Sequence, residues 1–218
     1  MNDLLTSLNG GNVPTLDLIF MMTLVALLPS IVVMMTSFTR TIIILSFTRN
    51  AMGVQQAPPN MVLVGISIFL TLYIMNPVIG EINETAYQPY VQGEITQEEA
   101  LSRMTVPMKE FMLRNTKKDV LDHFVEMSGS EVQEDVKDYP LTIVTPAFMT
   151  SELEWGFMAG FLIYLPFLLI DIVVATTLMS MGMVMLPPTM VALPFKLLLF
   201  VTVDGWELLF STIVHSFH

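Results

Sequence analysis

The chain has 218 residues, of which 53% are hydrophobic and 13% charged, against roughly a quarter charged in an ordinary soluble domain. Its mean hydropathy is +0.66, and it contains 19 methionines and no cysteine. These values argue against a soluble globular enzyme, a disordered chain and a disulfide-stapled secreted domain. The net charge of −11 argues against a nucleic-acid partner. A membrane protein, or one packed among membrane helices, remains.

Four apolar segments are long enough to cross a bilayer core of ~30 Å as helices. The first, residues 18–39, and the second, residues 50–80, contain no Asp, Glu, Lys or Arg. The third, residues 155–180, is interrupted only by Asp171, and the fourth, about residues 190–214, contains three charges. No stretch carries a convincing strand pattern, so the sequence predicts an all-α fold.

A polar, acidic stretch separates the second apolar segment from the third. Residues 81–154 hold 15 acidic and 6 basic residues, which gives −9 of the total charge of −11. Thr96-Gln-Glu-Glu99 predicts a helix start, and Pro107 should bend or divide that helix. A second amphipathic stretch follows at residues 120–125. Ser151-Glu-Leu-Glu154 predicts the start of the third long helix.

The predicted organisation is one structural unit with three parts. These are a first helical hairpin (1–80), an acidic helical insertion (81–150) and a second helical hairpin (151–218). Arg40 and Arg49 lie between the first two apolar segments, which predicts that this connection faces the cytoplasm. By alternation, the insertion and the C-terminus face outward. No cleavable signal peptide is evident before the first segment, so we expect that segment to direct insertion.

The two predicted cytoplasmic turns resemble each other. Residues 52–62 align without a gap on residues 181–191, and Met-Gly, Pro-Pro and Met-Val recur at the same spacing. An internal repeat and a chance clustering of Met, Gly and Pro explain the match about equally well. In either case, Gly frees the backbone, and the second Pro can start the next helix.

Charges inside the apolar segments predict contacts with other helices, because an ionisable group at bilayer depth costs at least ~2.5–3.5 kcal/mol. Asp204 and Glu207 are expected at an outer interface, whereas apolar side chains flank Lys196. With the hairpin apex near Pro187, Asp171 lies ~24 Å along its helix and Lys196 ~13 Å along the next. Because these depths differ, we expect Lys196 to meet an acid of a neighbouring subunit in an oligomer.

Five methionines crowd the second turn: Met179, Met181, Met183, Met185 and Met190. Ordinary apolar filling is the simpler explanation. However, methionine is unbranched and adaptable, so it can seal against surfaces of differing shape. A ring of these side chains from several subunits would close a pore without gripping any one sequence.

The sequence shows no catalytic constellation. It has no Gly-rich phosphate loop and no nucleophile–base pair, and the spacing of His123, His215 and His218 does not fit a metal site. We therefore expect no enzyme activity, no cofactor and no metal.

Longer strings resemble the FliP family of subunits of the flagellar type III protein export gate, whose relatives serve injectisome secretion systems. The similarity runs from the first apolar segment to the last. The strings are Ser37-Phe-Thr-Arg40, Arg49–Asn60, Thr150-Ser-Glu-Leu153, and Ala192–Lys196 through Val203-Asp-Gly-Trp206.

The resemblance implies a core channel-forming subunit that passes unfolded flagellar proteins across the bacterial inner membrane, within the flagellar basal body. About five copies would form a helical, ring-like oligomer with FliQ and FliR, and the gate would engage FlhB. Although the helices look transmembrane, the family's assembly lies largely on the periplasmic side, where the acidic insertion would be.

The family's methionine-rich constriction resembles Met183-Val184-Met185, with Met181 beside it. The resemblance therefore implies that these four residues seal the pore. Val184 departs from the all-methionine form of the family, and a β-branched residue should narrow the adaptability of the seal at that place.

Other positions match the family's subunit contacts. Lys196 matches its basic position, and Glu152 or Asp171 would be the acidic side of that inter-subunit contact. Phe111 and Phe124 lie in the insertion, in helices that resemble the family's outer inter-subunit contacts.

Two alternatives remain open: an injectisome export-gate subunit, and a small-solute or ion transporter. A transporter should bury its charges at a midplane site within one chain, beside broken helices. An export gate should instead place its charges at subunit boundaries and its methionines around a shared axis.

Overall fold

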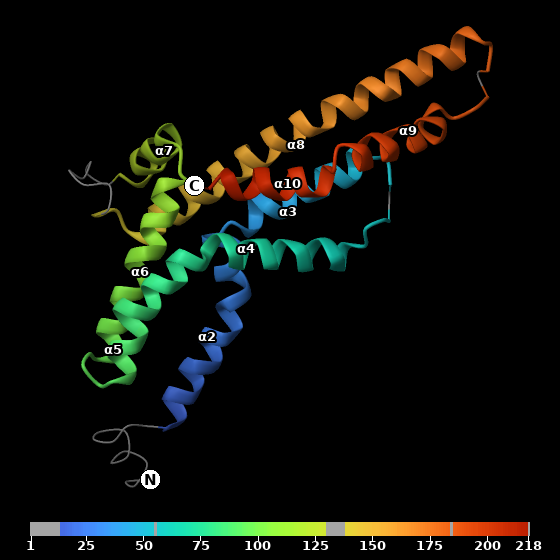
Figure 1. Ribbon diagram of the computed structural model, residues 1–218. Coiled ribbons are helices and arrows are strands. Elements are labelled where there is room, and N and C mark those ends of the chain that lie inside the picture. The colour runs from blue at the N-terminus through green and yellow to red at the C-terminus, as the bar shows by residue number, and fades with distance from the viewer. Residues whose placement is uncertain (1–13, 55, 130–137, 184, 218) are drawn as a thin grey trace, which may run out of the picture.

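A computed structural model describes residues 14–54, 56–129, 138–183 and 185–217, and within these ranges the regular structure is entirely helical. This confirms the predicted all-α class. The elements in chain order (Figure 1) are α2 (Pro14–Met35), α3 (Phe38–Ala51), α4 (Asn60–Ile82), the π-helix η1 (Asn83–Tyr87), α5 (Gln88–Val91), α6 (Gln97–Arg114), α7 (Lys118–Ser128), α8 (Leu141–Ser180), α9 (Pro188–Thr202) and α10 (Gly205–His215).

The long helix α8 organises the arrangement. Helix α3 runs parallel to the first half of α8, and α9 runs back along its second half (Figure 1). The last turns of α3 and α8 and the first turns of α4 and α9 lie toward one side of the molecule, whereas α5, α6 and α7 lie toward the other (Figure 1). The two hairpins α3–α4 and α8–α9 therefore point the same way.

The first apolar segment differs from its prediction. Residues 18–39 do not form one helix that ends before a connection, because the chain bends by 78° between α2 and α3. Arg40, predicted in the cytoplasmic connection, lies buried in α3. The prediction fails because a hydropathy pattern does not show which charges pair in the fold. Glu152 of α8 pairs with Arg40, and this pairing makes a buried position of Arg40 in a helix favourable. The packed first hairpin is accordingly α3–α4.

The predicted start of the third long helix is also wrong. Helix α8 begins at Leu141, directly after Pro140, so Ser151 and Glu152 lie in its interior and are fully buried. The Ser151 hydroxyl donates to the carbonyl of Ala147 (3.0 Å) and accepts from the backbone N–H of Lys117 (3.1 Å). Tertiary partners, rather than a helix end, satisfy these polar groups.

The acidic insertion forms the two predicted helices, α6 and α7. Thr96 caps α6, because its hydroxyl oxygen accepts from the backbone N–H of Glu99 at 3.3 Å. Pro107 does not divide α6, which continues unbroken to Arg114. Leu121 and Val125 of α7 are buried, so the amphipathic pattern at residues 120–125 was correctly read as a helix face.

Two glycines allow α3 and α8 to approach closely. A Cβ on Gly156 would lie 3.1 Å from Cγ2 of Ile43, and one on Gly160 would lie 2.6 Å from Cγ of Phe47. The spacing of four residues between the glycines is the small-xxx-small pattern of close helix pairs. The partner helix belongs to the same chain, so this seam is part of the subunit's own core.

The second half of α8 projects from that core as an arm. With 40 residues, α8 is about 60 Å long, which is twice the thickness of a bilayer's hydrocarbon core. Among the residues that the structure describes, two continuous helical stretches, Asn60–Val91 and Leu141–Ser180, are long and apolar enough to cross a membrane, or up to four if each bent helix pair is one span. Large apolar side chains are exposed along the arm, among them Phe161, Leu162, Leu169, Ile172 and Val173.

Replacing Gly160 with alanine should destabilise the chain by about 1–3 kcal/mol, because the added methyl overlaps the ring of Phe47. The matched control is Gly65→Ala in α4, where no atom lies within 4 Å of the added Cβ. That change should leave stability unchanged or raise it slightly. Thermal unfolding followed by circular dichroism measures both, and equal midpoints for the two variants would contradict the close seam.

Candidate functional site

The methionine-rich connection lies at the tip of the arm (Figure 1). Helix α8 ends with Gly182 in the left-handed conformation, at φ +73°. The N–H of Gly182 donates to the carbonyl of Met179 (3.1 Å), and the N–H of Met183 donates to that of Leu178 (3.0 Å). This is a Schellman cap, which stops the helix and turns the chain toward α9.

The methionines at the tip are open to the surroundings of the chain. Met185 is 98% exposed, Met190 73% and Met181 67%, whereas Met183 is less exposed at 40%. Val184 lies outside the described residues. The described tip methionines are therefore not packed in the core of their own chain.

The first connection repeats part of this local structure, since the N–H of Gly53 donates to the carbonyl of Asn50 (3.0 Å). Gly53 has φ +79°, close to the value at Gly182, and each follows the last helical turn of the preceding helix. The second proline of each turn lies at the next helix start, since Pro188 is the first residue of α9 and Pro59 precedes α4. The shared geometry favours the internal repeat over chance clustering.

Lys196 finds its partner inside its own chain, contrary to the sequence argument. Its Nζ lies 2.6 Å from Oδ2 of Asp171 and donates to the carbonyl of Ala51 at 3.1 Å. The Lys196 side chain is buried, and that of Asp171 is partly buried. The pair joins α9 to α8, and the second bond joins both to the end of α3.

The depth argument failed because it placed the hairpin apex at Pro187. Helix α8 ends at Ser180, and α9 begins at Pro188. Asp171 is therefore nine residues from its helix end and Lys196 eight from its helix start, or about 14 Å and 12 Å at the helical rise. The two side chains lie at the same depth, so the connection of seven residues decides the pairing.

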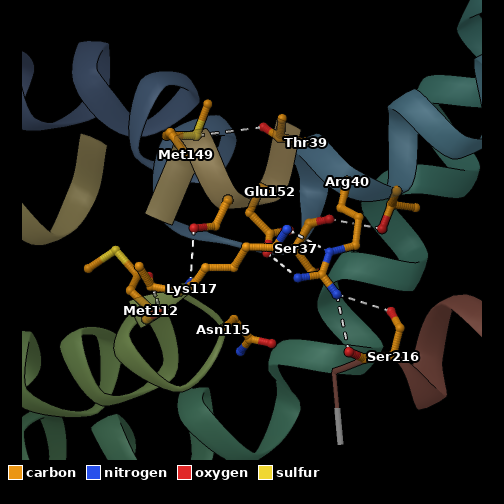
Figure 2. A network of polar contacts seen from close by, with 12 residues as sticks. Ser37, Thr39, Arg40, Met112, Asn115, Lys117, Met149, Glu152 and Ser216 are labelled. Atoms are coloured by element: carbon orange, nitrogen blue, oxygen red, sulfur yellow. Dashed lines mark hydrogen bonds and ion pairs between the residues drawn. The ribbon is translucent and has the colours of Figure 1, made fainter. Parts of the chain in front are cut away.

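A second buried ion pair joins α3 to the middle of α8 (Figure 2). Arg40 contacts Glu152 through two parallel bonds, with Nε donating to Oε2 at 3.0 Å and Nη2 donating to Oε1. Nη1 of Arg40 donates to the carbonyl of Ser216 (3.1 Å), and the guanidinium lies 3.9 Å from the ring centroid of Phe217. One arginine therefore holds three distant segments together.

This pair corrects the sequence assignment of Glu152 and reveals a residue that sequence reasoning missed. Arg40 occupies both carboxylate oxygens of Glu152, whose side chain is fully buried. An inter-subunit bond from Glu152 would require breaking this pair. Arg40 directly follows an apolar run, and this position could have indicated a buried arginine in need of a counter-charge. The sequence argument drew from Arg40 only the side of the membrane that its connection faces.

Phe111 is likewise a core residue rather than a surface contact. It is 2% exposed, and its ring packs on Phe148 and Phe217, with centroids 6.0 and 6.1 Å apart. This corrects its assignment as an outer inter-subunit residue, because the fold leaves no Phe111 surface for a neighbour. Phe124 is half-buried against the same core.

Comparison with known proteins identifies the family to which this helical arrangement belongs. The model of the FliP family matches residues 21–213, which span all of the helices that form the seam, the arm and the tip. The chain belongs to the FliP family. This confirms the resemblance drawn from the sequence strings.

Several curated relatives share the name "Flagellar biosynthetic protein FliP". The protein of Bacillus subtilis (strain 168) is 46% identical over 203 residues, covering 93% of this chain and 92% of the relative. That of Aquifex aeolicus (strain VF5) is 44% identical over 210 residues, covering 95% and 88%. That of Pectobacterium carotovorum subsp. carotovorum is 45% identical over 212 residues, covering 96% and 82%.

A charge exchange distinguishes pairing within one chain from pairing between subunits. Lys196→Asp alone and Asp171→Lys alone should each reduce the protease-resistant chain recovered from membranes, because each buries two like charges. Both changes in one chain should restore most of it. Co-expressing the two single variants should not, and recovery in that mixture would show that the partners come from different chains.

Proposed function

We propose that this chain is a core channel-forming subunit of the flagellar type III protein export gate, passing unfolded flagellar proteins across the bacterial inner membrane. Family membership over residues 21–213 is the observation that carries the proposal. The relatives at 44–46% identity are all named for flagellar biosynthesis. That shared name favours the flagellar machine over an injectisome.

The exposed tip supports a sealing role. Met181, Met183 and Met185 lie together after the Schellman cap and are available for contact outside their own chain. Tips from several copies around one axis would bring flexible apolar side chains into a narrow ring, and Val184 is their neighbour in the sequence. A constriction of this kind excludes water and ions by dewetting, yet it yields to an unfolded polypeptide. The work of the subunit is then to hold and open a gate, not to catalyse a reaction.

The exposed helices support an oligomer that includes other proteins. Phe69 on α4, Phe161 on α8 and Leu198 on α9 are all well exposed, and together such faces make apolar surfaces larger than a soluble monomer tolerates. About five copies, with FliQ and FliR as sister subunits and FlhB docking on the gate, would cover them. Because the two buried ion pairs are closed within one chain, these apolar faces are the main inter-subunit surfaces.

The length of α8 supports an assembly that rises out of the membrane plane. A helix of about 60 Å exceeds the ~40–45 Å of a whole bilayer with its headgroups. The N-terminal end of α8 packs against α6 and α7 of the acidic insertion. We infer that this end, with the insertion, lies on the periplasmic side, and that the tips point toward the cytoplasm.

The transporter alternative draws on two features of the fold. Charges are paired inside one chain, and α9 and α10 form a broken helix pair, which are the features that we expected of a transporter. Family membership outweighs these two features. The two buried ion pairs join α3 and α9 to α8, so they are explained as contacts that hold the fold together. Charge pairing within one chain therefore does not distinguish a transporter from an export-gate subunit.

Replacing Met183 and Met185 with alanine should make the closed gate leak ions while the oligomer still forms, because shorter side chains leave a wetted gap. The matched control is Met127→Ala, since Met127 is exposed on α7 of the insertion, on the other side of the molecule. Ion conductance across membranes that contain the co-expressed gate measures the effect. Unchanged conductance in an intact oligomer would contradict the seal.

A further inference from the structure

The fourth apolar segment, which the sequence predicted as one helix, is broken near its middle. Helices α9 and α10 are bent by 63° at the break, where Val203 and Asp204 separate them. As one straight helix, residues 188–215 would be about 42 Å long. A proline does not cause the break, because Pro194 lies well inside α9. The bend therefore requires another physical cause.

The backbone of Asp204 supplies the first part of that cause. Asp204 has φ +51° and ψ +47°, and it is the one non-glycine with positive φ among the described residues. Aspartate and asparagine are the non-glycine residues that tolerate this left-handed conformation best. The carbonyl of Asp204 accepts from the N–H of Leu208 at 3.1 Å, so the left-handed residue directly starts α10.

Gly205 supplies the second part. A Cβ at this position would lie 2.5 Å from two ring carbons of Phe200, closer than a methyl group can approach. The ring of Phe200 is held in place by Trp206, at a centroid distance of 5.1 Å in an edge-to-face arrangement, and by Phe167 at 6.3 Å. The missing side chain of Gly205 thus lets the bent backbone close on a fixed aromatic ring.

The far end of α10 supplies the third part, a contact that we call the clasp. It consists of Ser216 and Phe217 bound to Arg40: the Ser216 carbonyl and hydroxyl accept from Nη1, and Phe217 lies under the guanidinium. Phe217 also stacks on Phe111. A straight α9–α10 helix would carry the clasp residues away from Arg40, so the clasp and the bend depend on each other.

We propose that Asp204-Gly205 is a fixed elbow, locked by Phe200 at the bend and by the clasp at the end of α10. The elbow makes a long apolar segment return to its own chain, so that the arm and the buried Arg40–Glu152 pair are mechanically joined. A local backbone strain of this kind persists only where the surrounding contacts over-determine it. The inference does not depend on the proposed function.

The absence of cysteine from the sequence makes a direct distance measurement possible. Met190→Cys and His215→Cys place two spin labels on exposed positions at opposite ends of the segment. In the full chain, pulsed electron spin resonance should give one narrow distance distribution. It should be centred about 5 Å below the ~38 Å axial separation of the two positions in a straight helix.

Substitutions at the elbow then separate its two components. Asp204→Gly should keep the narrow distribution, because glycine adopts the left-handed conformation freely. Gly205→Ala should broaden the distribution toward longer distances, because the added methyl meets the ring of Phe200. Phe200→Ala should also broaden it, because the ring that locks the bend is removed. The matched control is Gly80→Ala, because a Cβ there meets no atom within 4 Å.

Either of two results would overturn the fixed elbow. The first is a wild-type distribution that already extends to the straight-helix distance. The second is a Gly205→Ala distribution identical to that of the Gly80→Ala control. If Gly205→Ala does not fold, Phe200→Ala still decides the matter, because a distribution as narrow as that of the unsubstituted chain would contradict the locking role of Phe200.

Discussion

The buried pair between Arg40 and Glu152 is the interaction on which the rest of the fold depends. Two charges removed from water are tolerated only with close, fully hydrogen-bonded geometry, and the parallel bonds of this pair provide it. The pair fixes the register of α3 on α8, after which Ile43 meets Gly156 and Phe47 meets Gly160. The steps advance three and then four residues on α3 and four residues each time on α8, which keeps every contact on the same helix faces, so one ionic contact aligns the whole seam.

The same pair gathers the outlying parts of the chain. Through Arg40 it holds the C-terminal clasp, and through Phe217 it reaches Phe111 in the insertion. The rings of Phe111 and Phe217 and the buried charges are thus used inside one subunit. What remains for other molecules is apolar surface on α4, α8 and α9, with methionines at the tip of the arm. This division of surfaces fits a subunit that folds first and assembles afterwards.

Local features of the fold could be predicted from the sequence. The Thr96 cap, the amphipathic face of α7 and the glycine turns at Gly53 and Gly182 depend on residues within a few positions of one another. The exposure of the tip methionines was also consistent with their clustering in a turn. Recognition of the family needed only continuous strings, which are as informative in a sequence as in a structure.

Features that depend on tertiary pairing could not be predicted in this way. Hydropathy treats Arg40 as a charge to be kept in water, although Glu152, 112 residues away, makes it a core residue. The partner of Lys196 depended on the length of a turn, which the pattern of apolar residues does not reveal. The elbow at Asp204 requires the ring of Phe200 and the clasp, and neither leaves a periodic signal.

The central claim is that the tips of several copies meet around one axis, while each core closes on itself. A single cysteine at Met185 tests it most directly, because the chain has no other thiol and Met185 is the most exposed of the tip methionines. With the remaining export genes co-expressed, mild oxidation in membranes should convert the Met185→Cys chain into disulfide-linked dimers on a non-reducing gel. A chain that stays monomeric, while every copy still reacts with a water-soluble maleimide, would contradict the account.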